Sequence, residues 1–117
     1  MKKILIIEDD ADTLDWLEFF VEDIGFQVLP SLSKPSIKSI IEQHPDLILL
    51  DYWLNDGYGS DICLELKANP GTKDIPVILM SVAFQLPQIA RDCHADGYIL
   101  KPFNLSDLEN LVREKLR

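Results

Sequence analysis

The stretch PDLILLDYWLNDGYG, residues 45–59, contains the pattern that decides the fold of this chain. An unbroken apolar run from Leu47 to Leu50 ends at Asp51, and a loop with two glycines follows. A short, wholly apolar run is typical of a strand that is buried on both faces, as in the parallel sheets of α/β proteins. With a helix expected at residues 60–68, the stretch predicts a strand, a loop and a helix in that order.

The same alternation of an apolar strand and a helix recurs along the whole chain. The strands are expected at residues 4–7, 26–29, 47–50, 76–80 and 98–100. The helices are expected at residues 12–24, 35–43, 60–68 and 86–95, and after Asn104, which can cap the last of them. Parallel strands need crossover helices, and those helices bury both faces of the sheet. Five strands alternating with five helices therefore predict a doubly wound α/β domain.

Size and composition set further limits on the kind of protein. The 117 residues, 47% of them hydrophobic, suffice for one core, so we expect a single domain over residues 1–117 with no appended output domain. Two cysteines are too few for a disulfide framework, and no leader sequence precedes the first strand, which predicts a reducing, cytoplasmic setting. The longest apolar runs are too short to cross a membrane, so no membrane association is expected.

Charge is strongly negative and unevenly distributed. The net charge is −9, and eight of the 20 acidic residues lie between Glu8 and Asp23. A surface that binds nucleic acid needs an excess of basic residues, so the composition predicts that this chain does not bind nucleic acid directly. We expect some of these acids on the solvated face of the first helix and the others at the end of the first strand.

Chemically reactive side chains are expected at one edge of the sheet. In an open α/β sheet, ligands bind beyond the carboxyl ends of the strands. Those ends carry Glu8 and Asp9, then Asp51, Ser81 and Lys101. Two carboxylates about 4 Å apart repel by about 4 kcal/mol at an effective dielectric constant near 20, so a cluster of three predicts a bound cation. Carboxylates without histidine or cysteine ligands favour Mg²⁺.

Asp51 is the candidate nucleophile of this cluster, because it lies between a long apolar strand and a glycine-containing loop. A carboxylate that attacks a phosphoryl group forms an aspartyl phosphate, and catalysis then depends on positioning and on neutralising charge. Mg²⁺ and Lys101 would supply positive charge, and the Ser81 hydroxyl can donate to a phosphate oxygen. A phosphate on Asp51 would draw the loop after Ser81 towards it and so act as a switch.

Four segments together resemble the receiver domain of two-component response regulators over essentially the whole chain. They are KILIIEDD at residues 3–10, PDLILLDYWLNDGYG at 45–59, IPVILMS at 75–81 and ADGYILKPF at 95–103. The resemblance implies a flavodoxin-like (βα)5 three-layer sandwich whose five-stranded parallel sheet has the order 2-1-3-4-5. It also implies a phosphoacceptor domain that receives its phosphoryl group from a histidine kinase or a histidine phosphotransfer protein.

The resemblance also implies a role for individual residues. Glu8 and Asp9 resemble the acidic pair that holds Mg²⁺, Asp51 resembles the phosphoacceptor, and Trp53 matches the position whose backbone carbonyl binds the metal. Ser81 and Lys101 match the hydroxyl and the lysine that contact the phosphate, and Tyr98 matches an aromatic residue that turns inward on activation. Pro102 after Lys101 matches a Lys-Pro pair that is often cis. Such a domain is not an enzyme for an external substrate, although it is expected to catalyse its own phosphorylation and dephosphorylation.

Three departures from the family pattern bear on the reaction. Asn55 replaces a proline, which would loosen the loop after Asp51. Val82 replaces a small residue after Ser81, and its β-branched side chain would narrow access to the phosphate and slow the cycle. The segment from Ser81 to Lys101 is about two residues shorter than is typical, and it belongs to the face expected to signal.

Two other functions remain open from the sequence. One is a phosphorylation-independent interaction module that keeps the fold without the reaction. The other is a phosphatase with an aspartyl nucleophile, which is disfavoured because such enzymes carry a second aspartate where this chain has Trp53. The sequence names neither the downstream protein target nor the cognate kinase, and it leaves a phosphorylation-dependent homodimer open.

Overall fold

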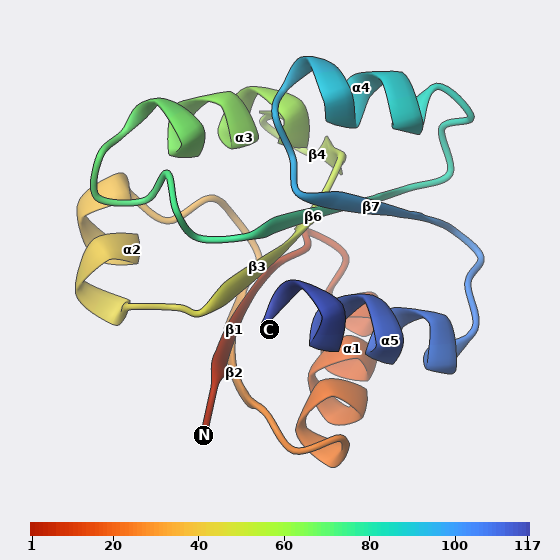
Figure 1. Cartoon of the computed structure of the whole chain (residues 1–117). Helices are drawn as coiled ribbons and strands as arrows, with labels where there is room; N and C mark the ends of the chain where they lie inside the picture. The colour runs from red at the N-terminus through yellow and green to blue at the C-terminus, as the bar shows by residue number, and fades with distance from the viewer.

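The computed structural model describes residues 1–117 and contains a five-stranded parallel sheet with helices on both faces. The strands of the sheet are β1 (Lys3–Ile7), β2 (Gln27–Ser31), β3 (Leu47–Asp51), β6 (Val77–Ser81) and β7 (Gly97–Leu100). The helices are α1 (Ala11–Asp23), α2 (Ile37–Gln43), α3 (Gly59–Ala68), α4 (Leu86–Asp92) and α5 (Leu105–Lys115). Helices α1 and α5 cover one face of the sheet, and α2, α3 and α4 cover the other (Figure 1).

The sheet has the order β2-β1-β3-β6-β7, and every neighbouring pair is parallel. Counted within this sheet alone, the order is 2-1-3-4-5. The predicted doubly wound, flavodoxin-like fold is therefore confirmed. No helix of the chain combines the length and the apolar character needed to span a bilayer.

Strand side chains alternate between two separate cores because successive residues of a strand point to opposite faces. The core under α1 and α5 contains Ile4, Ile6, Leu47, Leu49, Ile78 and Met80 from the strands. The core under α2, α3 and α4 contains Leu5, Ile7, Ile48, Leu50, Val77 and Leu79. This two-sided burial explains why the central strands consist of continuous apolar runs.

The helix ends follow local capping rules. The Asn104 side chain accepts a hydrogen bond from the Asp107 backbone N–H, as the sequence predicts for the last helix (2.8 Å). Asp10 caps α1 in the same way through the Thr13 N–H, a role that the sequence did not reveal. Gly25 follows α1 with a φ of +103°, a backbone conformation that glycine adopts without strain.

Most elements match the expected ranges to within one or two residues at each end, but two parts of the structure differ further. Helix α4 ends at Asp92 rather than residue 95, because the chain turns into the left-handed region at His94 (φ +63°). The loop after β3 also contains a two-stranded antiparallel hairpin, β4 (Trp53–Leu54) and β5 (Gly57–Tyr58), which the sequence predicted only as a loop. Two-residue strands are too short to show a periodic pattern.

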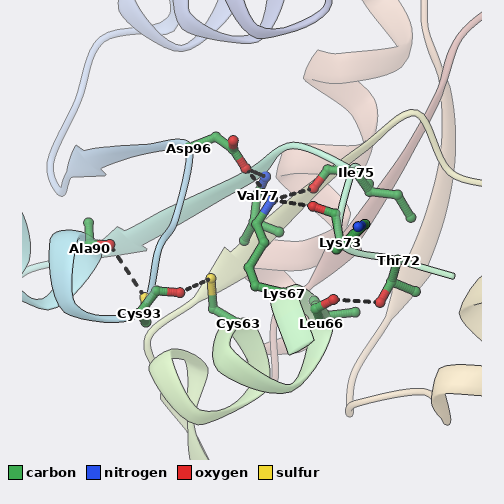
Figure 2. A network of polar contacts seen from close by, with 10 residues as sticks. All are labelled: Cys63, Leu66, Lys67, Thr72, Lys73, Ile75, Val77, Ala90, Cys93 and Asp96. Atoms are coloured by element: carbon green, nitrogen blue, oxygen red, sulfur yellow. Dashed lines mark hydrogen bonds and ion pairs between the residues drawn. The ribbon is translucent and has the colours of Figure 1, made fainter. Parts of the chain in front are cut away.

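A partly buried polar network fastens α3 to the edge of the sheet where the strands begin (Figure 2). The Lys67 ammonium donates to the backbone carbonyls of Lys73 (3.2 Å) and Ile75 (2.9 Å) and forms an ion pair with Asp96 (2.6 Å). The same Asp96 oxygen accepts a hydrogen bond from the Val77 backbone N–H at the start of β6 (2.8 Å). One side chain thus joins α3, the turn before β6 and the residue before β7.

Both cysteines lie beside this network, in the packed interior of the protein. The Cys63 thiol donates to the Cys93 backbone carbonyl (3.3 Å), and both residues are buried and free of disulfides (Figure 2). Burial, together with the neighbouring Cys93 thiol, raises the pKa of Cys63 well above its usual value. The thiolate, the reactive form of cysteine, is therefore disfavoured at this position.

Candidate functional site

The carboxyl ends of four strands bring the predicted site residues together. Glu8 follows β1, Asp51 ends β3, Ser81 ends β6 and Lys101 follows β7. Glu8, Asp51 and Ser81 are buried, with exposed fractions of 2%, 6% and 1%. One carboxylate oxygen each from Glu8, Asp9 and Asp51 lies within 4.8 Å of the other two. Three carboxylates therefore share one small volume at the edge of the sheet.

Lys101 is the basic residue of this cluster. Its ammonium donates to Oε1 of Glu8 at 3.0 Å and lies 3.5 Å from Oδ1 of Asp51. Its backbone N–H donates to the carbonyl of Ser81 (2.8 Å), which continues the pairing of β7 with β6. The Lys101–Pro102 peptide bond is cis, as the resemblance implies. The ammonium is thus held between two of the three carboxylates.

The charges at Asp51 do not balance. Burial raises the pKa of Asp51 to about 7, and the nearby Glu8 carboxylate adds to the rise, while the Lys101 ammonium works against it. A single ammonium therefore does not compensate three carboxylates. A bound divalent cation would favour the charged form of Asp51, and the hard oxygen ligands fit Mg²⁺. The residues present at this edge are consistent with the metal that the resemblance implies.

Ser81 and Tyr98 have different surroundings. The Ser81 hydroxyl oxygen accepts a hydrogen bond from the Ala83 backbone N–H (3.1 Å), so it is tied to the loop between β6 and α4. Tyr98 lies on β7 with 43% of its surface exposed, so its ring is not enclosed in the core. Ser81 therefore lies buried at the carboxyl end of β6, the strand next to β3, whereas Tyr98 is exposed on β7.

An open, largely apolar groove of about 540 Å³ lies beside Lys101. It is lined by Asp12, Thr13, Trp16, Leu17, Val82, Lys101, Pro102 and Phe103. Val82, one of the departures noted in the sequence, is 67% exposed and stands at the rim of this groove. The groove places apolar surface next to the charged cluster.

Trp53 belongs to the hairpin that follows Asp51. Its indole is 51% exposed and meets the rings of Tyr52 and Tyr58, with ring centroids 5.1 Å and 5.4 Å away. The Tyr52 and Tyr58 rings stack on each other at 5.4 Å. This aromatic cluster was not predicted from the sequence, although the turn residues Asn55, Asp56 and Gly57 between apolar residues were the available signal for a hairpin.

Comparison with known families gives a clear result. The family model of the response regulator receiver domain matches residues 4–113. The chain belongs to this family. It is thus a receiver domain of the kind found in two-component response regulators, as the four sequence segments indicated.

Curated relatives of this receiver domain include transcriptional regulators. It is 33% identical over 119 residues to the phosphate regulon transcriptional regulatory protein PhoB of Escherichia coli, covering 99% of this chain and 52% of PhoB. It is 32% identical over 120 residues to the DNA-binding dual master transcriptional regulator RpaA of Synechocystis, covering 100% of this chain and 50% of RpaA. The chain spans about half the length of these relatives.

Solved structures show the same receiver fold. A CheY-like receiver domain protein from Methanospirillum hungatei superposes with a TM-score of 0.86 at 27% identity, covering 99% of this chain and 94% of that one. A response regulator from Chloroflexus aurantiacus gives a TM-score of 0.91 at 24% identity, covering 98% and 97%. TrrA of Thermotoga maritima, solved in complex with Mg²⁺ and BeF, gives 0.88 at 23% identity, covering 99% and 100%. The latter two likenesses support the fold alone.

Proposed function

We propose that this receiver domain accepts a phosphoryl group on Asp51 in a Mg²⁺-dependent reaction and thereby switches a protein-binding face. The observation that carries the proposal is the cluster of three carboxylates within 4.8 Å, with the Lys101 ammonium held against two of them. The cluster occupies the edge where ligands bind in open α/β sheets. It therefore combines an acceptor carboxylate with the groups that would neutralise a phosphate.

Mg²⁺ would be held by the carboxylates of Glu8, Asp9 and Asp51 and by the backbone carbonyl of Trp53. Bound there, it would neutralise part of the charge on the carboxylates and on the incoming phosphoryl oxygens. Glu8 is buried and already bonded to Lys101, so it would anchor the site, whereas the partly exposed Asp9 would border solvent.

Phosphorylation forms one bond and breaks another. An oxygen of the charged Asp51 carboxylate attacks phosphorus, and an O–P bond forms as the bond between phosphorus and the donor atom breaks. The donor atom keeps the electron pair of the broken bond. The Lys101 ammonium, already 3.5 Å from Asp51, pairs with a phosphoryl oxygen, and the Ser81 hydroxyl donates to another. In the separate dephosphorylation step, water attacks phosphorus, the bond between phosphorus and the Asp51 oxygen breaks, and inorganic phosphate leaves while the carboxylate is regenerated.

The proposed phosphodonor is the phosphohistidine of a histidine kinase or of a histidine phosphotransfer protein. A protein donor is favoured because an apolar groove lies beside the charged cluster. Trp16 and Val82, both exposed, line this groove together with Lys101, and Phe84, in the loop after β6, is 81% exposed. Exposed apolar surface next to a charged site is typical of protein interaction sites.

The proposed output is a change in the face formed by α4, β7 and α5. A phosphate on Asp51 would attract the Ser81 hydroxyl, which now accepts from Ala83, and so move the loop that leads into α4. Tyr98, on β7 of the same face, would turn inward when that loop moves. The partner of this face is a protein or a second copy of the chain. Direct binding of nucleic acid is not part of the proposal, since the DNA-binding names belong to relatives about twice as long.

Labelling with a small radioactive acyl phosphate in the presence of Mg²⁺ tests the reaction. The wild-type protein should incorporate about one phosphoryl group per chain, and Asp51→Asn should incorporate none. Asp56→Asn is the matched control, because Asp56 is an exposed aspartate of the same loop, and it should be labelled like the wild type. Equal labelling of wild type and Asp51→Asn would overturn the assignment. An unlabelled wild type would favour a phosphorylation-independent interaction module.

A further inference from the structure

Gly59, the first residue of α3, lies unusually close to the backbone of the proposed phosphoacceptor. A Cβ atom at position 59 would lie 2.3 Å from the carbonyl oxygen of Asp51 and 3.0 Å from the Cα atom of Tyr52. Both contacts are with backbone atoms, which cannot rotate away as a flexible side chain does. The contact therefore excludes every residue except glycine unless the backbone itself moves.

Conformation does not explain the glycine. The glycines of this chain with positive φ are Gly25 and Gly57, and Gly59 has the ordinary backbone of a helical residue. Nothing lies within 4 Å of the Cβ position at either Gly25 or Gly57. Glycine is thus required at position 59 because there is no space for a Cβ atom beside the Asp51 backbone.

Gly59 also closes the base of the β4–β5 hairpin. Its backbone N–H donates to the carbonyl of Tyr52 at 2.7 Å. Above this bond, Trp53 pairs with Tyr58 across the hairpin. The chain therefore leaves Asp51, makes the hairpin and returns to within contact distance of Asp51 eight residues later.

Of the segments that meet here, the hairpin is the one held least firmly. Asp51 is paired with Met80 of β6, and the Tyr52 N–H donates to the Met80 carbonyl (2.9 Å). On the other side, α3 is held in the core by Ile62 and Leu66, which are both buried. A Cβ atom at position 59 would therefore force the Asp51–Tyr52 peptide bond and the start of α3 apart. The hairpin between these two points, which includes Trp53, would move with them.

We propose that Gly59 is a positioning residue for the metal site, because its missing Cβ fixes the Trp53 carbonyl relative to the carboxylate of Asp51. The inference rests on the proposed function, in which both groups bind Mg²⁺. A side chain at position 59 would separate the two ligands and weaken Mg²⁺ binding while the fold persists.

The first test measures Mg²⁺ affinity in Gly59→Ala. Trp53 emission is followed in a Trp16→Phe background, where Trp53 is the only tryptophan. The Mg²⁺ concentration at half-saturation should rise about tenfold, and the Mg²⁺ dependence of labelling should shift by the same factor, with a smaller change in the maximal rate. A large change in Mg²⁺ half-saturation with a small change in the maximal labelling rate indicates weaker metal binding. A general disturbance of the fold would instead lower the maximal rate or the folded fraction.

Gly71→Ala is the matched control. A Cβ atom there would meet the flexible side chain of Ile41 at 2.6 Å, so it also disturbs packing, but it does so away from the acidic cluster. Its Mg²⁺ affinity should equal that of the wild type. Unchanged affinity in folded Gly59→Ala, or an equal loss of affinity in Gly71→Ala, would overturn the inference.

A measurement on the wild-type protein does not depend on whether Gly59→Ala folds. Hydrogen exchange of the Gly59 amide should slow several-fold when Mg²⁺ is added, because bound metal holds the hairpin base closed. The Gly25 amide, bonded to Glu22 at the end of α1, should not respond. If wild-type protein binds Mg²⁺ while Gly59 exchange is unchanged, the inference fails and the proposed function stands. If the wild type neither binds Mg²⁺ nor is labelled, both fail.

Discussion

Burial and charge act in opposite directions at Asp51. The carboxylate is almost fully enclosed, beside Glu8, and its ammonium partner Lys101 is shared with Glu8. The raised pKa shows that enclosure outweighs the attraction of the ammonium. In its charged form, which the proposed reaction needs, Asp51 therefore destabilises the metal-free folded state.

This cost should make the stability of the metal-free protein depend on pH. Because the pKa of Asp51 rises from 3.8 to about 7 on folding, the folded state binds the proton more tightly. The stability that the protonated Asp51 carboxyl gives the folded state is present in full below about pH 4, and it is lost as the pH rises through about 7. Asp51→Asn should therefore be more stable than the wild type by about 2–4 kcal/mol at pH 8, and by little near pH 4. Urea unfolding of the two proteins at pH 4 and at pH 8, with a chelator present, measures these stability differences.

Asp56→Asn is the control for removal of an aspartate from this loop. Asp56 is exposed, so its substitution should change the free energy of unfolding by less than about 0.5 kcal/mol at either pH. Added Mg²⁺ should stabilise the wild type more than Asp51→Asn and so narrow their difference. A wild type more stable than Asp51→Asn at pH 8 without metal would contradict the raised pKa.

At the scale of single elements, the ends of helices show how far local sequence determines structure. Asn104 and Gly25 have the expected roles because capping and positive φ depend on neighbouring residues. The early end of α4 was not foreseen, because a histidine rather than a glycine takes the left-handed conformation there. Glycine is the usual residue at such positions, and histidine, although enriched there, occurs far more often elsewhere, so it gives only a weak signal for a helix end.

Removal of the Asn104 cap should weaken α5 by a known amount. Asn104→Ala leaves the Asp107 N–H without its side-chain acceptor, so the free energy of unfolding should fall by about 1 kcal/mol. Chemical denaturation measures this loss. Asn104→Ser should retain most of the stability, since serine also caps helices well. Equal losses in the two variants would show that packing, and not capping, gives Asn104 its effect.

At the scale of the whole molecule, Lys67 joins segments that are distant in sequence. Its ammonium donates to the carbonyls of Lys73 and Ile75 and to the carboxylate of Asp96, and its side chain is 13% exposed. Lys34, which pairs with Glu65 at the surface, is 31% exposed and is bonded to that one partner. The two lysines thus allow a direct comparison of a partly buried network with a surface ion pair.

Lys67→Met should lower the free energy of unfolding by about 1–2 kcal/mol, because it removes the donor to two backbone carbonyls and the cation that pairs with Asp96. Lys34→Met should lower it by less than about 1 kcal/mol. Both values come from equilibrium denaturation at neutral pH. A loss at Lys67 no larger than that at Lys34 would show that water replaces the ammonium at little cost.

The sequence predicts the sheet and the acidic cluster well, for one shared reason. Burial on both faces forces continuous apolar strands, and in a parallel sheet the residues after those strands must meet at one edge. Glu8, Asp51 and Lys101 could therefore be assigned to one site without coordinates. The closeness of Gly59 to Asp51 and the pairing of Lys67 with Asp96 could not be predicted, since both depend on how helix α3 is seated and neither leaves a periodic pattern.

The pairing of Lys101 with Glu8 joins residues separated by 93 positions in the chain. During synthesis the segments that carry the three carboxylates leave the ribosome first, and the ammonium emerges only with the end of β7. A nascent chain that has already assembled β1, β2 and β3 therefore carries mutually repelling acids without their partner. Docking of β7 beside β6 would complete the sheet and bring the Lys101 ammonium to the carboxylates in the same event, so the strand of this sheet that is made last is also the one that relieves their repulsion.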